Sequence, residues 1–182
     1  CILGKMPQHT FPSQQTTSSR PLQLVHSDLC GPFPTKSISG SVYFVSFIDD
    51  YSKFTVITFL KAKTQALSAF KNYHSLAENL TNQKLQFLQM DGGEYHSNEF
   101  INFCKSQGIH HRRSVPHTPQ QNGIVERKNR SLLNTTRNML HVAKLESKFS
   151  KEAIVTAYYI QNRIYHQSLG FLTPFELCLP LI

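Results

Sequence analysis

Apolar and β-branched residues alternate with polar ones over three short stretches in the first third of the chain. This period of two is typical of strands and runs through residues 22–26, 41–48 and 54–60. The first stretch breaks at Gly31, and the polar residues 49–53 supply a turn between the other two. We therefore expect three strands, of which the second and third form a hairpin.

The period changes to three and four residues over 64–81, which predicts an amphipathic helix. Residues 85–90 read as a short strand, 98–107 as a short helix closed by Gly108, and 109–115 as another strand. A loop over 116–123 and helices over 124–143 and 148–166 complete the pattern. The resulting order, β-β-β-α-β-α-β-α-α, predicts one α/β domain with a mixed sheet flanked by helices.

Composition favours a single domain that binds a polyanion. The chain has 182 residues, of which 40% are hydrophobic, and its net charge is +8. An excess of basic residues most often indicates a nucleic-acid partner. No apolar run is long enough to span a membrane, and no secretory signal is evident. Four cysteines without a CxxC pair fit a reducing compartment.

Three carboxylates stand in characteristic surroundings. Asp28 lies in His-Ser-Asp-Leu-Cys-Gly-Pro, Asp91 in Met-Asp-Gly-Gly-Glu-Tyr, and Glu126 follows Gln-Gln-Asn-Gly-Ile-Val. The first two come near predicted strand ends, and the third lies early in a helix. Breaking or joining a phosphodiester needs an activated oxygen nucleophile and a stabilised leaving oxygen, which two Mg²⁺ ions bound by carboxylates supply. Taken singly, Asp28 would be a turn residue and Glu126 a solvated first-turn residue.

These strings resemble the catalytic core of retrotransposon integrases, most closely the copia-type group. The pattern His-x-Asp-x-x-Gly-Pro surrounds Asp28, and Thr-Pro-Gln-Gln-Asn-Gly precedes Glu126. The resemblance covers nearly the whole chain and implies an RNase H-like fold with a mixed five-stranded sheet. It also implies a polynucleotidyl transferase with nuclease activity, which processes the 3′ ends of retroelement DNA and joins them to target DNA. By the same resemblance, Asp28 bridges two Mg²⁺ or Mn²⁺ ions, and Asp91 and Glu126 hold one each.

Asp91 departs from the family pattern by one residue. Only Gly92 and Gly93 separate it from Glu94, where the family usually has three residues. Either the glycine turn is shortened, or the strand is shifted and Met90 fills the ligand position. A shift of one residue turns a strand's side chains to the opposite face. We favour the shortened turn, because glycines absorb a deletion more easily than a buried strand does.

Basic and amide residues around Glu126 are the predicted DNA contacts. They are Gln120, Gln121 and Asn122 in the expected loop, and Arg127, Lys128 and Arg130 on the helix that follows. Arg130 is one turn beyond Glu126 and shares its side of the helix. Phosphate contacts of this kind position a strand without reading its sequence. The alternative for the helix is a solvated basic face. Arg112 and Arg113 extend the basic track in a direction that the sequence leaves open.

Other candidate ligands are interpreted as structural. Asp49 and Asp50 belong to the hairpin turn, and Glu94 is expected to face its own turn. His110, His111 and His117 lack a second cluster with zinc spacing and are read as ordinary strand and loop residues.

Residues 1–20 are polar and read as an N-terminal arm, with residues 21–182 as the integrase core. Cys1 resembles the end of the family's zinc-binding segment, but a lone cysteine makes no zinc site, so zinc is not expected here. We expect a fragment of a longer polyprotein that acts as a homo-multimer on retroelement and target DNA, with no membrane association. The expected location is the nucleus, reached from a cytoplasmic particle.

Two alternatives remain open at this stage. A catalytically degenerate integrase-like domain that only binds nucleic acid is favoured by the shortened turn and the late start of the chain. An RNA–DNA hybrid nuclease of the same fold is disfavoured, because that group's additional carboxylate and histidine pattern is not evident.

Overall fold

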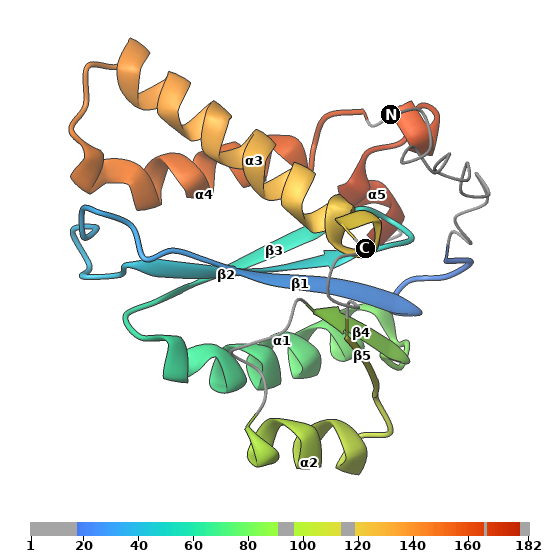
Figure 1. The fold of residues 1–182 in the computed structure, drawn as a ribbon. Helices are drawn as coiled ribbons and strands as arrows, with labels where there is room; N and C mark the ends of the chain where they lie inside the picture. Colours follow the sequence, from blue (N-terminus) through green and yellow to red (C-terminus); the bar gives the residue numbers. More distant parts are fainter. Residues whose placement is uncertain (1–17, 91–96, 114–118, 166, 179–182) are drawn as a thin grey trace, which may run out of the picture.

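A mixed sheet forms the centre of the computed structural model, which describes residues 18–90, 97–113, 119–165 and 167–178 (Figure 1). Within these residues the sheet has five strands in the order β3-β2-β1-β4-β5. β1 pairs antiparallel with β2 and β2 with β3, whereas β4 pairs parallel with both β1 and β5. The predicted mixed five-stranded sheet is confirmed. The strands are β1 (Leu24–Cys30), β2 (Tyr43–Asp49), β3 (Thr55–Leu60), β4 (Phe87–Met90) and β5 (His110–Arg113).

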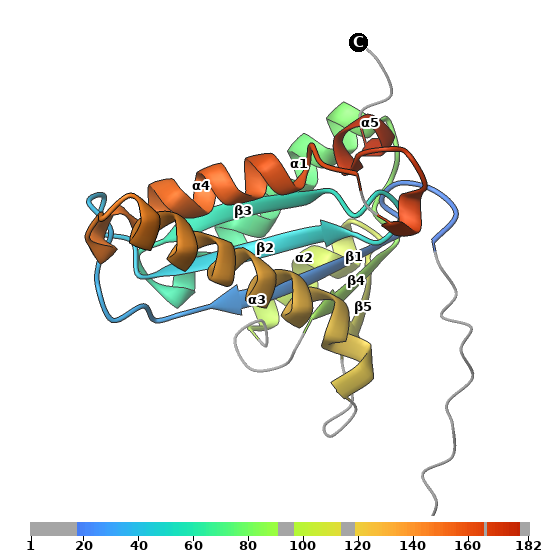
Figure 2. The same cartoon turned by 90° about the horizontal axis from the view of Figure 1, so that it is seen from above.

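Helices cover both faces of the sheet (Figures 1 and 2). Helices α1 (Ala66–Thr81) and α2 (Asn98–Ser106) lie on one face, and α3 (Pro119–Val142) and α4 (Ser150–Gln161) on the other. A short helix, α5 (Pro174–Cys178), follows α4. None of the helices in the described ranges is both long and apolar enough to cross a membrane.

The sheet separates two apolar clusters. Phe47, Phe70 and Leu88 are fully buried on the α1 and α2 side, where Phe47 stacks on Tyr73 with ring centroids 4.3 Å apart. The smaller cluster on the α3 and α4 side includes Phe44 and the buried residues Ile57, Leu132, Ile154 and Ala157. Successive residues of a strand point to opposite faces, so each central strand contributes to both clusters. The side chains of β1 that face α3 are therefore His26, Asp28 and Cys30.

The hairpin between β2 and β3 is confirmed, and its two aspartates hold it together. Asp49 accepts hydrogen bonds from the Leu22 and Ser52 amides, both at 2.8 Å, and burial raises the pKa of its carboxyl. Burial would also raise the pKa of Asp50, but hydrogen bonds from His26 and Lys53 lower it overall. Both carboxylates are engaged in the turn, as expected of structural residues.

The expected loop over residues 116–123 is wrong from Pro119 onward, because α3 begins there. Proline lacks a backbone N–H, but the first residues of a helix have no intrahelical acceptor for that group, so Pro119 starts the helix at little cost. Residues 116–118 lie outside the described part of the chain. The predicted long helix is thus extended by more than a turn at its beginning.

The last predicted helix is shorter than expected. α4 ends at Gln161, and the next residue, Asn162, is 1% exposed. Its side chain accepts a hydrogen bond from the Thr55 amide at 3.0 Å and donates one to the Thr55 carbonyl at 2.8 Å. This paired contact fixes the chain against β3 at the point where the periodicity alone would continue the helix.

Gly31 ends β1 in a conformation that requires glycine. Its φ is +129°, and a Cβ at this position would lie 2.6 Å from the Val42 carbonyl oxygen. Other residues rarely adopt such a φ, and the neighbouring backbone leaves no room for a side chain. The glycine in the motif after Asp28 is therefore explained by backbone packing.

Candidate active site

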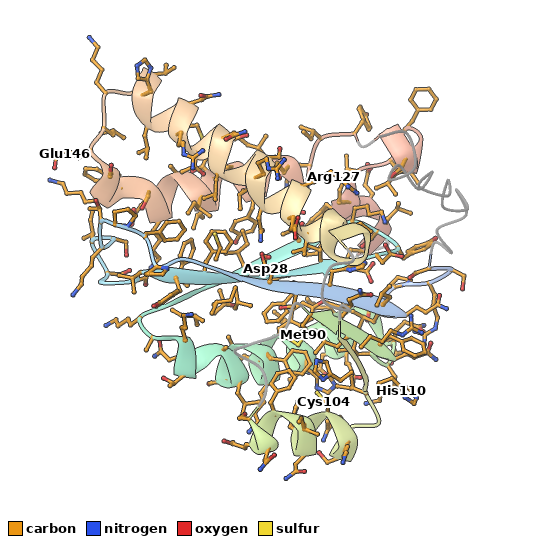
Figure 3. The ribbon with its side chains drawn as sticks, viewed as in Figure 1. Asp28, Met90, Cys104, His110, Arg127 and Glu146 are labelled. Atoms are coloured by element: carbon orange, nitrogen blue, oxygen red, sulfur yellow. The ribbon has the colours of Figure 1, made fainter. Side chains whose placement is uncertain are left out.

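Asp28 lies on the central strand of the sheet, held between β2 and β4. It pairs with Ser46 of β2, whose hydroxyl donates to the Asp28 carbonyl oxygen at 3.4 Å. The half-buried carboxylate faces α3 (Figure 3). There Asn129 Nδ2 donates a hydrogen bond to Asp28 Oδ2 at 2.9 Å. The position of this carboxylate is thus fixed by strand pairing and by a helix from the second half of the chain.

A hollow of about 320 Å³ lies between β1 and α3. Asp28 lines it from the strand, and the helix supplies Glu126, Asn129, Arg130, Leu133 and Arg137. The helical residues are spaced by three and four positions, which places them on one side of α3. Two of the three predicted carboxylates therefore meet at one cavity, although they are far apart in the sequence.

The hollow combines acidic and basic groups and is open to solvent. Its charged lining consists of Asp28, Glu126, Arg130 and Arg137. The side chains of Glu126 and Arg130 are exposed. Carboxylates that bind divalent cations and guanidinium groups that pair with phosphate oxygens are the two components that phosphodiester chemistry needs. The arrangement suits a bound phosphate whose negative charge is neutralised both by divalent cations and by the arginines.

Cys30 lies next to Asp28 on the same face of β1, and its thiol stays protonated. Burial raises the pKa of Cys30 to about 11, with a further rise from the negative charge of Asp28 and a decrease from Arg137. A thiolate is required for nucleophilic chemistry or metal binding at a cysteine. Cys30 is therefore a packing residue of the α3 side of the sheet.

Asn129 offers a further oxygen beside Asp28. The residue is 5% exposed, and its Oδ1 is buried without a hydrogen-bond partner among the described residues. A buried polar atom of this kind is costly unless a ligand satisfies it. Together with the carboxylates of Asp28 and Glu126, it gives a set of oxygen donors of the type that Mg²⁺ prefers. The residues present fit a divalent metal ion.

Met90 lies on the face of the sheet opposite Asp28. It pairs with Ser27 in the β1–β4 ladder, is 1% exposed and packs in the cluster beneath α1 and α2. Figure 3 shows Asp28 and Met90 on opposite sides of the sheet. The alternative in which Met90 fills the ligand position is therefore wrong. Asp91 and Glu94 lie outside the described residues, and so does His117. No three His, Cys, Asp or Glu side chains among the described residues form a metal cluster.

The predicted DNA contacts all belong to α3. Arg127 is exposed and its guanidinium runs back over Gly123, whereas Lys128 is half-buried and burial lowers its pKa. Gln120, Gln121 and Asn122 lie in the first turns of the helix, with side chains outside the described part. These residues belong to the start of α3, and later residues of the same helix line the hollow.

The histidines of β5 make ring contacts. His110 stacks with Phe87 at 5.3 Å, and His111 meets Phe100 edge-on at 5.8 Å. Both are engaged in ordinary packing, as expected.

Sequence reasoning missed the role of Asn129 and of Arg137 in the hollow. Both lie at helical spacing from Glu126, so the same periodicity that indicated Arg130 would have indicated them. The hydrogen bond of Asn129 to Asp28 depends on how α3 crosses the sheet, which no local pattern reveals.

The strand order and the helices on both faces of the sheet define an RNase H-like fold, and solved structures support that class. The chain matches a chain of the simian T-cell lymphotropic virus intasome in complex with the PP2A regulatory subunit B56 gamma, with a TM-score of 0.74 and 21% identity over 95% of this chain and 60% of that chain. It also matches the HTLV-2 integrase catalytic core domain in complex with magnesium, with a TM-score of 0.64 and 21% identity over 87% of this chain and 97% of that one. At this identity, the likeness shows the fold.

The chain belongs to the integrase core domain family, whose model matches residues 18–119. It is 43% identical over 175 residues to the Retrovirus-related Pol polyprotein from transposon TNT 1-94 of Nicotiana tabacum, and 31% identical over 179 residues to that from transposon RE2 of Arabidopsis thaliana. These alignments cover 96% and 97% of this chain but only 13% and 12% of the polyproteins. The chain therefore spans about an eighth of the length of these relatives.

Proposed function

We propose that this chain is the catalytic core of a copia-type retrotransposon integrase that trims the 3′ ends of retroelement DNA and joins them to target DNA. The observation that carries the proposal is the shared hollow, in which Asp28 of β1 and Glu126 of α3 meet beside two arginines. Membership of the integrase core family supports the same activity. The proposed setting is a multimer of this chain on DNA in the nucleus, with residues 21–182 as the catalytic unit.

Asp28, Asp91 and Glu126 are the residues that would hold the proposed Mg²⁺ or Mn²⁺ ions, two in number. The register of β1 and β4 supports the choice of Asp91 over its neighbour, because Met90 pairs with Ser27 and lies on the face opposite Asp28. When bound, the ions supply activation of the attacking oxygen and stabilisation of the leaving oxygen.

The protein's own residues position the reacting groups. Asn129 holds the Asp28 carboxylate through its 2.9 Å hydrogen bond, and so acts as a positioning residue. Arg130 and Arg137 line the hollow and are proposed to bind phosphate oxygens. The remaining proposed DNA contacts are Gln120, Gln121, Asn122, Arg127 and Lys128. Because such contacts reach the DNA backbone, they orient the strand without selecting its sequence.

Both proposed steps exchange one phosphorus–oxygen bond for another. In trimming, a water oxygen attacks phosphorus and the bond from phosphorus to the 3′ oxygen of the retained strand breaks, which leaves a free 3′-hydroxyl on that strand and a 5′-phosphate on the departing nucleotides. In joining, that hydroxyl attacks a phosphodiester of target DNA and releases a new 3′-hydroxyl there. The bond formed replaces the bond broken, so no ATP is required. Correct alignment of the reactants supplies much of the rate.

Divalent cations are expected to be essential for activity. With Mn²⁺ and a labelled branched DNA that mimics the joined product, the chain should yield the resealed strand on a denaturing gel, and EDTA should abolish the product. Salt-sensitive DNA binding without any product in Mg²⁺ or Mn²⁺ would instead favour the degenerate, binding-only domain. Preferential cutting of an RNA–DNA hybrid would favour the nuclease of the same fold.

Asn129→Ala is expected to weaken metal use while leaving the three carboxylate ligands in place. Removing a hydrogen-bonded partner of a metal ligand typically costs about 10- to 100-fold in metal affinity or activity. A titration of the initial rate with Mg²⁺ should shift to higher concentrations. Asn138→Ala, an exposed change further along α3, is the matched control and should leave the titration unchanged. Identical curves for both variants would contradict the positioning role.

A further inference from the structure

The structure settles the direction of Arg112, which the sequence leaves open. Arg112 pairs with Gln89 of β4, and Gln89 pairs with His26 of β1. Residues opposite one another in a ladder share a face, so Arg112 is on the face of the sheet that carries His26 and Asp28. The neighbouring His111 confirms the alternation, because its ring meets Phe100, which is buried on the other side.

Arg112 is exposed and lies flat on an aromatic ring. Its Cζ is 3.7 Å from the centroid of the Phe87 ring, and His110 stacks on the same ring at 5.3 Å with 28° between the planes. A stacked guanidinium keeps its five N–H donors in its plane and loses less entropy when it forms hydrogen bonds. None of the ion pairs in the described ranges includes Arg112. Its charge is available for an anionic ligand.

The distance to the proposed reaction centre suits a DNA strand. Strand spacing puts Arg112 about 10 Å across the sheet from β1, and Asp28 is about 7 Å further along that strand, so the two Cα atoms are roughly 12 Å apart. A B-DNA strand advances about 3.4 Å per nucleotide, so this span corresponds to about three to four nucleotides. The chain carries a net charge of +8, which favours a polyanionic ligand.

We infer that Arg112, held on Phe87 at the edge strand β5, binds a backbone phosphate of the DNA a few nucleotides away from the phosphodiester in the hollow. The inference rests on the proposed function, because it takes DNA to be the ligand. Stacking alone does not make the site: Arg163 lies at the same 3.7 Å from the Tyr159 ring, but it follows α4, which packs against β3 at the opposite edge of the sheet. What distinguishes Arg112 is its position on β5, at the edge of the sheet on the β4 side of Asp28.

The test is the salt dependence of DNA binding, measured by fluorescence anisotropy with the full chain and a short labelled duplex. Loss of one phosphate contact should lower the slope of log affinity against log salt by about one unit. Arg112→Gln is expected to show that decrease and to bind about tenfold more weakly near 0.1 M salt. Arg163→Gln is the control, because Arg163 also lies 3.7 Å from an aromatic ring but at the opposite edge of the sheet, and it should match the wild type in both quantities.

A second variant tests the role of the ring. Phe87→Leu keeps the Arg112 charge but removes its platform, so the slope should stay at the wild-type value while affinity falls about threefold. Thermal melts of each variant establish that the fold is intact. The inference is overturned if Arg112→Gln keeps the wild-type DNA affinity and salt slope while Arg130→Gln lowers both.

Joining assays on the same preparations separate this inference from the proposed function. A wild-type chain that binds DNA and shows the Arg112 effect but gives no joined product would contradict the proposed function alone. A wild-type chain that joins DNA while Arg112→Gln binds normally would contradict the Arg112 site alone. Absence of DNA binding by the wild type would overturn both.

Discussion

Glu126→Gln is expected to reduce DNA joining by about a thousandfold or more, equivalent to a loss of about 4 kcal/mol of transition-state stabilisation. Glutamine keeps the length and shape of the side chain but removes the negative charge that a divalent cation requires of its ligand. Glu126 is exposed on α3 and lines the hollow, so the change should leave the fold intact. The measurement is the rate of product formation with Mn²⁺ on a denaturing gel.

Glu146→Gln is the matched control for this experiment. Glu146 is exposed, its carboxylate bonds only Lys148 among the described residues, and it lies far from Asp28, beyond the opposite end of α3 (Figure 3). The same chemical change at that position should leave the rate unchanged. Equal product from Glu126→Gln and Glu146→Gln would remove Glu126 from the chemistry.

Asp91→Asn is expected to abolish joining to a similar extent, by about a thousandfold. The proposed site assigns this carboxylate one of the two ions, and asparagine offers a neutral oxygen in its place. The β1–β4 register supports this choice, because it places Met90, the alternative ligand, on the face opposite Asp28. The rate should be measured at saturating Mn²⁺, so that weakened metal binding alone does not account for the loss.

Met90→Leu separates the two interpretations of the shortened glycine turn. Met90 is buried under α1 and α2, and a leucine of similar volume should cost less than about 1.5 kcal/mol of stability. Its joining rate should stay near that of the wild type. The opposite pattern, an inactive but stable Met90→Leu beside an active Asp91→Asn, would contradict the assignment of Asp91.

Periodicity predicted the sheet well because its signal is local. The turn at residues 49–53 and the strands on either side follow from alternation and turn chemistry, and the structure has the hairpin there. The ends of the helices were harder to predict. Pro119 begins α3, although proline in a sequence usually indicates a loop. Asn162 follows the end of α4 and is held by hydrogen bonds to Thr55, more than a hundred residues away.

The candidate site was predictable only in part. Motifs indicated Asp28 and Glu126, and the structure places both at one hollow. The contact of Asn129 with Asp28 depends on how a helix crosses a strand, which sequence spacing does not encode. The direction of Arg112 likewise required the parallel register of β4 and β5, which fixes the face that each residue of the edge strand occupies.

The hydrogen bond between Asn129 and Asp28 joins residues 101 positions apart. During synthesis, Asp28 emerges from the ribosome before α3, so an incomplete chain lacks the Asn129 hydrogen bond to its carboxylate. The hollow forms only when α3 packs against β1. Under the proposed function, chains that end before α3 are therefore expected to have no joining activity.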